Sequence, residues 1–269
     1  MAYEKELEIA IFLAKISGKK IMEYFKSKNQ SVQKKHDGTL VTKADTESEN
    51  IILEGIKNNF PVDGIVSEES DKTRSQEREW HIDPLDGTGS FLMGETDFSI
   101  NIGLCKKGLP VLGVVFKPAT NELYFGVRGE SSYKVDKNGK KIKLSVQKKK
   151  LTSIIAAIGF NKNAEKINSL LIKELQISKT IKIGSTGLKI LSVAEGNSNL
   201  FFSPLLNSKT WDFCAPQVIL ESAGGIMEYL DKEKILYTNL INLKNYFLVT
   251  NSRELMESAQ RKLSSFFKN

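Results

Sequence analysis

Five acidic residues stand in three short motifs, each bordered by apolar residues. They are Glu68, Glu69, Asp83, Asp86 and Asp212. In a partly buried site such carboxylates would repel one another, and bound cations relieve that repulsion. Oxygen ligands select hard cations such as Mg²⁺, Mn²⁺ or Ca²⁺. The three motifs therefore predict an oxygen-ligand site for divalent cations.

Each motif also has a structural explanation when it is taken singly. Adjacent glutamates usually lie on a solvated face, and Asp-Gly pairs such as Asp86-Gly87 are common turn formers. An Asp before a helix, as Asp212 stands before the expected helix Phe213–Ala223, is more often a cap than a ligand. We expect Asp212 to do both, and the metal hypothesis depends on the joint occurrence of the motifs.

The segment around Pro84 is expected to bind an anion beside the carboxylates. Trp80–Ile82 indicates a strand, and Pro84 should prevent it from continuing as an ordinary ladder strand, so the chain should turn there. The amides of Gly87 and Thr88 should then open a short helical turn toward Leu92. Free amides at such a turn bind anions, and phosphate is the natural occupant beside metal-bound carboxylates.

Helices and short strands must position these motifs in the first half of the chain. An apolar stripe from Leu7 to Phe25 predicts a helix that ends near Ser27, and a second helix is expected over Asp45–Asn59. Between residues 64 and 146, short β-rich runs separated by turn signals favour an antiparallel sheet. The runs are Ile65–Ser67, Trp80–Ile82, Phe98–Cys105, Val111–Phe116, Leu123–Val127, Ser131–Val135 and Ile142–Ser145.

Strands alternate with helices in the second half. Residues 147–151 include three lysines and should form a solvated junction between the halves. Strands are expected at 154–158, 180–183, 200–202, 225–230 and 246–250, and helices at 165–175, 186–195, 212–223 and 252–267. The chain should therefore divide into an N-terminal α+β half over 1–147 and a C-terminal α/β half over 148–269, the latter with the substrate pocket and Asp212.

Composition excludes several other kinds of site. The chain has 269 residues, a net charge of +7, two cysteines and two histidines. Cys105 and Cys214 argue against a disulfide framework or a Cys-ligated metal, and His36 and His81 leave little room for His-ligated metals or a Ser/His/Asp triad. We interpret His81 as structural. The sequence shows no signal peptide and no run of about 18 apolar residues, so a soluble, cytoplasmic protein without membrane contact is expected.

The motifs together resemble those of the lithium-sensitive, Mg²⁺-dependent phosphatases. This superfamily includes inositol monophosphatases, fructose-1,6-bisphosphatases and 3′(2′),5′-bisphosphate nucleotidases. The similar segments are Thr42–Asp45, Glu68-Glu69, Trp80–Thr88 and Trp211–Pro216, in the family's order. The resemblance implies an α/β (α+β) fold, a layered αβαβα sandwich with the acidic cluster at the seam of the two halves.

The resemblance also implies two to three Mg²⁺ ions and a role for each matching residue. Glu68, Asp83 and the Leu85 carbonyl would bind the first ion, Asp83, Asp86 and Asp212 the second, and Glu69 a weaker third ion or its water. Thr88, hydrogen-bonded to Asp45, would orient and deprotonate the attacking water. Substrate contacts would come from Glu68, Asp86, Gly87, Thr88, Ser185, Lys189, Lys209 and Asp212.

Within this superfamily the sequence is most similar to the bisphosphate nucleotidases. The similarity rests on Gly184–Lys189, Val193–Gly196 and Trp211–Leu220, while Gly89-Ser90 departs from the usual residues before Phe91. A substrate with two phosphates needs cationic groups beyond the metals, and Lys189 and Lys209 are candidates for the second phosphate. Ordinary surface positions are an equal alternative for both lysines.

The leading functional expectation is a phosphomonoesterase that removes the 3′-phosphate of adenosine 3′,5′-bisphosphate to give AMP. An inositol-1-phosphate or sugar-phosphate phosphatase is the alternative on the same scaffold. A basic, non-enzymatic nucleic-acid-binding regulator belongs to a different class, and the acidic cluster argues against it because it would repel a phosphate backbone. A small phosphomonoester is thus the expected partner, and a homodimer stays open.

Overall fold

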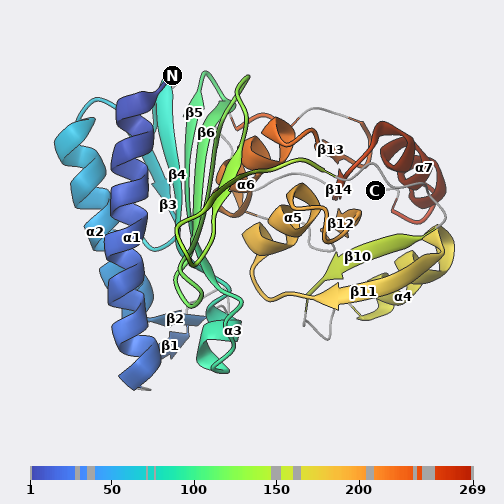
Figure 1. Cartoon of the computed structure of the whole chain (residues 1–269), viewed down its shortest axis with the longest axis horizontal. Helices are drawn as coiled ribbons and strands as arrows, with labels where there is room; N and C mark the ends of the chain where they lie inside the picture. Colours follow the sequence, from blue (N-terminus) through green and yellow to red (C-terminus); the bar gives the residue numbers. More distant parts are fainter. Residues whose placement is uncertain are drawn as a thin grey trace.

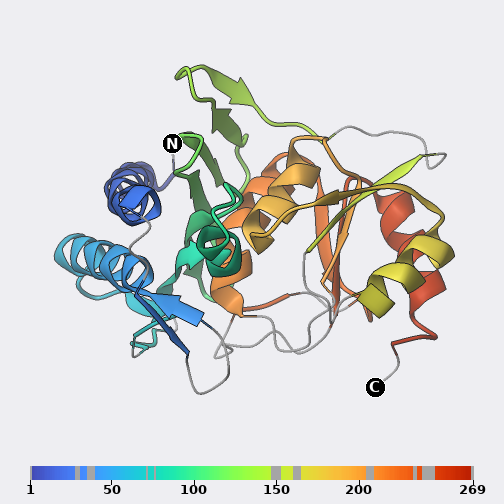
Figure 2. The same cartoon turned by 90° about the horizontal axis from the view of Figure 1, so that it is seen from below.

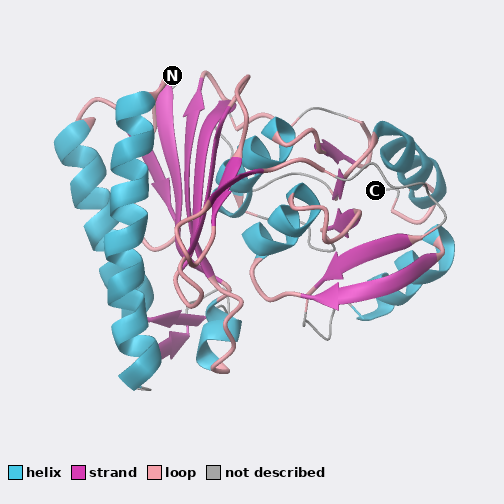
Figure 3. Cartoon of the chain, in the orientation of Figure 1, coloured by secondary structure: helices cyan, strands magenta, loops and turns pink. Residues whose placement is uncertain are grey.

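Layers of helix and sheet alternate along the long axis of the molecule (Figures 1 and 3). The computed structural model describes residues 2–27, 31–34, 40–70, 72–75, 77–146, 153–159, 165–203, 209–232, 235–237 and 246–267. In this part of the chain the order is a helix pair, a seven-stranded sheet, a second helix pair, a five-stranded sheet and a third helix pair. The expected αβαβα sandwich is confirmed.

The first layer is the pair α1 (Glu4–Ser27) and α2 (Lys43–Asn59), which lie at one side of the molecule in Figures 1 and 2. The predicted apolar stripe is buried against the large sheet, for example at Leu7, Leu13 and Ile21. Gly18 lets α1 approach this sheet closely, because a Cβ there would lie 2.4 Å from the ring of Phe116. Sequence periodicity therefore predicted both helices to within three residues at their ends.

The large sheet holds the strands in chain order, and it is antiparallel except for its first pair. Its strands are β3 (Gly64–Ser67), β4 (Arg78–Asp86), β5 (Ser99–Lys106), β6 (Leu109–Lys117), β7 (Glu122–Val127), β8 (Tyr133–Val135) and β9 (Lys141–Lys143). Strands β3 and β4 are parallel, so the loop after β3 and the end of β4 lie at the same edge of the sheet. The sequence did not predict this parallel pair.

The prediction that the chain turns at Pro84 is wrong. Strand β4 continues to Asp86, and its pairing with β5 shifts between Asp83, opposite Asn101, and Asp86, opposite Ser99. One extra residue on β4 therefore forms a bulge that contains Pro84. A proline is tolerated there because a bulge removes the need for a ladder N–H at that position.

A small two-stranded sheet, β1 (Val32–Lys34) and β2 (Leu40–Thr42), lies beside α3 (Thr88–Leu92) at the foot of the view in Figure 1. These two strands were not predicted from the sequence. The short helix α3 is the predicted helical turn after Gly87, so that expectation is confirmed.

The second half contributes two helix pairs and the smaller sheet. The central pair is α5 (Thr186–Ala194) and α6 (Thr210–Ser222), and the outer pair is α4 (Glu165–Leu175) and α7 (Arg253–Leu263). The sheet has the order β11-β10-β12-β14-β13, with β10 (Ile154–Ile158), β11 (Ile177–Lys182), β12 (Leu200–Phe202), β13 (Ile226–Tyr229) and β14 (Phe247–Thr250). β11 begins three residues earlier than expected, α6 begins two residues earlier than the expected 212–223, and α7 ends at Leu263, four residues before its expected end. The proposed junction at 147–151 lies outside the described residues.

Helix α6 packs closely on the large sheet because two glycines face it. A Cβ at Gly113 would lie 2.1 Å from the carbonyl oxygen of Ala215, and one at Gly103 would lie 2.5 Å from Cys214 Sγ. The same packing brings the sulfurs of Cys105 and Cys214 to 3.4 Å, although both are free thiols. This close contact sets the position of the first turn of α6, where Asp212 stands.

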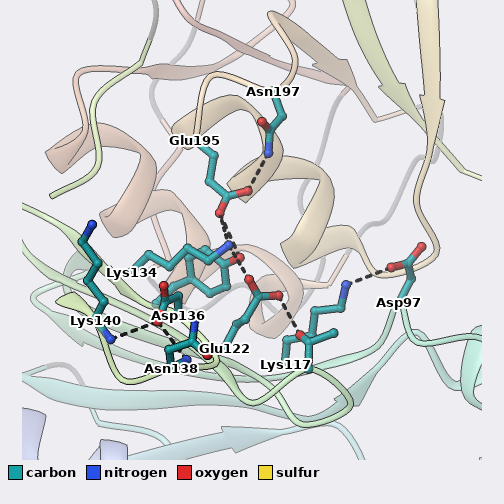
Figure 4. Close-up of polar contacts among 11 residues, drawn as sticks. Asp97, Lys117, Glu122, Lys134, Asp136, Asn138, Lys140, Glu195 and Asn197 are labelled. Atoms are coloured by element: carbon teal, nitrogen blue, oxygen red, sulfur yellow. Dashed lines mark hydrogen bonds and ion pairs between the residues drawn. The ribbon is translucent and has the colours of Figure 1, made fainter. Parts of the chain in front are cut away.

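A polar cluster joins the two halves on the other side of α5 (Figure 4). Lys134 on β8 contacts Glu122 at 2.5 Å and Glu195, the C-cap of α5, at 2.7 Å. Tyr124 also donates to Glu195 at 3.0 Å. Burial opposes the charge of Lys134, but its bonds to the two glutamates raise its pKa. The cluster therefore ties the C-terminal end of α5 to the large sheet.

Candidate active site

Asp45 lies buried in the first turn of α2. Its carboxylate accepts hydrogen bonds from the Thr42 backbone N–H at 2.8 Å and the Thr42 hydroxyl at 2.5 Å. The Thr88 hydroxyl lies 3.2 Å from Asp45 Oδ1 and 3.1 Å from the Leu85 carbonyl oxygen, so it can donate its single proton to either acceptor. Burial raises the pKa of Asp45 to about 6, although the Thr42 bonds oppose this shift.

The acidic motifs meet at the end of β4, where it adjoins α6. Asp83 is only 2 % exposed, and its pKa is raised first by burial and then by repulsion from Glu68, Asp86 and Asp212. The pKa of Asp212 is raised by burial and by repulsion from Asp86 and Glu68. Acids from three separate motifs therefore lie within electrostatic reach of one another, and each makes ionisation of the others less favourable.

The chemistry of this donor set fits a hard divalent cation. All donors are carboxylate or carbonyl oxygens, and a cation would relieve the repulsion that raises the pKa of Asp83 and Asp212. Across the described residues, however, no three Asp, Glu, His or Cys side chains are grouped closely enough to hold a metal ion as they stand. Cation binding would therefore have to draw the acidic side chains together.

Asp212 is not the N-cap that the sequence suggested. Helix α6 begins at Thr210, before Asp212, and its N-cap is Lys209. Asp212 therefore occupies the third helical position, where its carboxylate accepts the backbone N–H of Lys209 at 3.4 Å. Asp212 therefore caps the helix from within its first turn, as acids at the third helical position often do.

Asp86 is held by the N-terminus of α5. It accepts the Ser185 hydroxyl at 2.6 Å and the backbone N–H groups of Thr186 at 3.0 Å and Gly187 at 2.6 Å. Asn101 donates to it at 3.2 Å. The unpaired amides of a helix N-terminus favour a carboxylate in this place. Asp86 thus connects the acidic cluster to α5. Sequence reasoning missed Asn101, because no motif marked it.

Ser185, a predicted substrate contact, is fully buried and bonded within the protein. Its hydroxyl caps α5 by accepting the Leu188 N–H at 3.0 Å, and it lies 3.0 Å from the Ser99 hydroxyl as well as near Asp86. These contacts orient Asp86. A direct contact between Ser185 and substrate stays a prediction. Sequence reasoning did not identify Ser99.

Gly87 adopts a backbone conformation that requires glycine. Its φ is +92°, and a Cβ there would lie 2.9 Å from the Asp97 carbonyl oxygen. It is the N-cap of α3, so the Gly87 and Thr88 amides lie at the start of this short helix beside Asp86. The predicted phosphate contacts are thus adjacent to the acidic cluster in the fold.

The two predicted substrate lysines occupy different surroundings. Lys189 is 6 % exposed, donates to the Gly184 carbonyl at 3.0 Å and lies 5.4 Å from the ring centre of Phe201. Burial lowers its pKa, while Asp86 and Asp212 oppose that shift, so the ammonium group lies within reach of the cluster. The surface alternative is therefore wrong for Lys189.

Lys209 is half-buried beside the indole of Trp211, at 5.9 Å from the ring centre. Lys72, which sequence reasoning missed, lies 5.4 Å from the same ring and donates to the Ser70 carbonyl at 3.2 Å. No motif marked Lys72, because a lysine in a loop is usually solvated.

His81 is buried between β4 and α6. Its Nδ1 lies 3.0 Å from the Thr210 hydroxyl, its Nε2 lies 3.3 Å from Glu79, and its ring meets Tyr237 edge-on. Burial lowers its pKa, although Glu79 opposes the shift. These contacts agree with a structural role, and His36 lies outside the described residues.

The protein resembles known phosphatases over nearly its whole length. The model of the inositol monophosphatase family matches residues 2–265. Among curated proteins, inositol monophosphatase 3 of Solanum lycopersicum is 32% identical over 83% of this chain and 85% of its own length. Histidinol-phosphatase of Chlorobaculum parvum is 31% identical over 86% and 88%. The 3′(2′),5′-bisphosphate nucleotidase CysQ of Salmonella typhimurium is 30% identical over 86% and 94%.

Solved structures show the same fold. An inositol monophosphatase from Anabaena matches with a TM-score of 0.78 at 27% identity, covering 98% of this chain and 100% of that one. One from Thermotoga maritima matches with a TM-score of 0.82 at 24% identity, covering 97% and 99%. The matched family model, the related sequences and the shared layers agree, and the chain belongs to the inositol monophosphatase family.

Proposed function

We propose that the protein is a Mg²⁺-dependent nucleotidase that removes the 3′-phosphate of adenosine 3′,5′-bisphosphate to give AMP. The family is one of phosphatases, and its members generally depend on a metal, typically Mg²⁺. Relatives of this chain are named inositol monophosphatase, histidinol-phosphatase and bisphosphate nucleotidase, so the choice of substrate is our own proposal. It rests on one observation, the buried ammonium group of Lys189 beside the acidic cluster.

A buried lysine is costly unless its charge is compensated. The Gly184 carbonyl accepts one of the three N–H donors of Lys189, and Asp86 and Asp212 supply negative charge. A second phosphate on the substrate would add a charge-assisted partner to this ammonium group. A substrate with a single phosphate would not need the cation, and this difference favours a bisphosphate.

The residues around Thr88 can manage the proton of an attacking water. With a pKa of about 6, Asp45 is ionised at neutral pH and can accept a proton. The Thr88 hydroxyl would accept the proton of the water and pass its own to Asp45 Oδ1, 3.2 Å away. The amides of Gly87 and Thr88 would hold phosphoryl oxygens as charge develops.

The acidic cluster would hold the cations. Mg²⁺ bound there would neutralise phosphoryl charge and increase the acidity of water. We propose as ligands Glu68, Asp83, Asp86, Asp212 and the Leu85 carbonyl, with Glu69 at a weaker third ion. Because Asp86 also receives the α5 amides, it would connect the cation site to the helix that carries Lys189.

A substrate panel tests this proposal. Phosphate release is measured at fixed Mg²⁺ with adenosine 3′,5′-bisphosphate, inositol 1-phosphate, fructose 1,6-bisphosphate and histidinol phosphate. We expect the nucleotide to have the highest kcat/KM, and Lys189→Met to lower that value by about 10- to 100-fold while changing the value for inositol 1-phosphate much less. Lys182→Met, at an exposed position on β11, is the matched control.

Other outcomes would identify a different function. A preference for inositol 1-phosphate or a sugar phosphate that is unchanged in Lys189→Met would support the alternative phosphatase. No phosphate release from any substrate would favour a binding protein, and one relative at 29% identity is named Nus factor SuhB in Escherichia coli. RNA binding would then be measured directly.

A further inference from the structure

Glu49 is a buried carboxylate that the proposed chemistry does not use. It lies on α2, is 1 % exposed, and is surrounded by the segment that carries Glu68 and Glu69. Its Oε1 accepts the hydroxyl of Ser67 and, at 3.0 Å, the backbone N–H of Glu69. Its Oε2 accepts the Ser70 hydroxyl at 2.5 Å. Both oxygens are therefore bonded to the last residue of β3 and to the loop that follows it.

The same face of α2 supports the other parts of the site. Residues three and four positions apart lie on one helix face, and Asp45, Ser48 and Glu49 have this spacing. The Ser48 hydroxyl donates to the Pro84 carbonyl at 2.9 Å, within the bulge of β4. Asp45 receives Thr88 at the start of α3. One helix face thus contacts the three segments that carry Glu68, Asp83 and Thr88.

Burying the Glu49 carboxylate only to hold a loop in place would cost free energy. The described partners of Glu49 are hydroxyl and amide donors rather than cations, and these hydrogen bonds stabilise its negative charge. Its bond to the Glu69 N–H fixes the backbone between the two predicted ligands. An apolar residue could fill the same volume, but it could not orient this backbone.

We propose that Glu49 is a positioning residue that holds residues 67–70 so that Glu68 and Glu69 face Asp83. The inference rests on the proposed cation site, and it adds a determinant of cation affinity on α2. Residues that orient metal ligands commonly change metal affinity by 10- to 100-fold when they are replaced.

The test measures Mn²⁺ binding to the full-length protein without substrate, by electron paramagnetic resonance. Glu49→Leu removes all three bonds, and we expect it to weaken Mn²⁺ binding by about 10- to 100-fold. Glu49→Gln keeps the shape, and its amide can donate to Ser70 while its oxygen accepts from Ser67 and Glu69, so its affinity should stay within about threefold of wild type. Glu54→Leu, exposed on the same helix, is the control and should bind as wild type does.

Thermal unfolding of each variant separates positioning from folding. A Glu49→Leu protein that is folded at the assay temperature and binds Mn²⁺ as wild type does would overturn the proposal. If Glu49→Leu does not fold, Ser70→Ala decides, since it removes one bond and should weaken Mn²⁺ binding about threefold; unchanged affinity would again refute it.

The two proposals can fail separately. Wild-type protein that binds Mn²⁺ with the expected loss in Glu49→Leu, but hydrolyses no phosphate in the panel, would overturn only the proposed function. Wild-type protein that binds no Mn²⁺ would overturn both.

Discussion

The buried carboxylates of the acidic cluster suit cation binding but should lower the stability of the metal-free fold. Asp83 and Asp212 lie where burial and mutual repulsion raise the pKa of each. A raised carboxyl pKa means that the ionised form is less favourable in the folded than in the unfolded chain. The acids that we propose as cation ligands should therefore destabilise the metal-free fold at neutral pH.

This conflict predicts opposite effects of Asp83→Asn on activity and stability. The variant should lose Mg²⁺-dependent phosphate release, yet in EDTA at pH 7.5 its midpoint of thermal unfolding should exceed that of wild type. Because the pKa of Asp83 is raised in the folded protein, the stability of the metal-free wild type should decrease as the pH rises above about 4, the ordinary value for a carboxyl group. Asp45, with a pKa of about 6, should add to this decrease between about pH 4 and 6.

The measurement is calorimetric unfolding in EDTA from pH 4 to 8, beside phosphate release at saturating Mg²⁺. Glu54→Gln, an exposed acid on α2, should change neither quantity. Activity near that of wild type in Asp83→Asn would remove Asp83 from the site, and a lower unfolding midpoint at pH 7.5 would refute the electrostatic argument.

Among the elements, α6 depends most on close packing. It presses against β5 and β6 at Gly103 and Gly113, and its first turn presents Asp212 to the end of β4. His81 bonds the start of the same helix through Thr210. A change in the depth at which α6 packs should therefore alter both stability and the position of Asp212.

Gly113→Ala tests this dependence. The added Cβ would lie 2.1 Å from a backbone oxygen of α6, which cannot move away as a flexible side chain could. We expect the free energy of unfolding in urea to fall by about 1–3 kcal/mol, together with a weaker affinity for Mn²⁺. Gly89→Ala on α3 has nothing within 4 Å of the new Cβ and should preserve stability. Equal stability of the two variants would show that α6 has room to shift.

Local patterns predicted most elements but not the details of their ends. Pro84 correctly indicated an irregularity, yet the strand absorbs it in a bulge because β5 continues to pair with Asp86. The Asp212 motif correctly indicated a helix start, but tertiary contacts such as His81 with Thr210 extend α6 toward its N-terminus. Element boundaries depend on such contacts, which periodicity does not contain.

Across the whole molecule, both ends of α5 are fastened to the large sheet. Asp86 binds its N-terminus, and Tyr124 donates to Glu195 at its C-terminus. Lys134 pairs with Glu195 as well (Figure 4). Cys105 and Cys214 also meet across the halves. The fold thus joins its halves largely through α5 and α6.

None of the helices in the described residues combines the length and the hydrophobicity that a membrane span requires.

Lys134→Met should loosen this connection. Lys134 and its two glutamates are each no more than about one-fifth exposed, so removal of the cation leaves two acids close together with reduced solvation. We expect a loss of about 2 kcal/mol in the free energy of unfolding and a higher KM with little change in kcat.

Arg253→Met is the control for Lys134→Met, because Arg253 pairs with Glu228 while its own side chain is about half exposed. This substitution should lower the free energy of unfolding by less than about 1 kcal/mol. Urea unfolding and steady-state kinetics measure both variants. Equal losses in the two proteins would show that the Lys134 cluster is an ordinary surface feature.

The sequence by itself determined which residue types are available for the proposed chemistry, carboxylates rather than histidines or cysteines with a glycine turn beside them, and the order of most helices and strands. These follow from residue type and short spacing, because ligand preference and helical or strand periodicity are local properties. Only the tertiary structure decided which distant groups meet. Asp86 lies on the amides of α5, Lys189 is buried near the same acids, and Glu49 supports the loop of Glu68. The physical reason is that such contacts arise from how whole layers pack, here with glycines that let α6 approach the sheet, and no short motif specifies that distance.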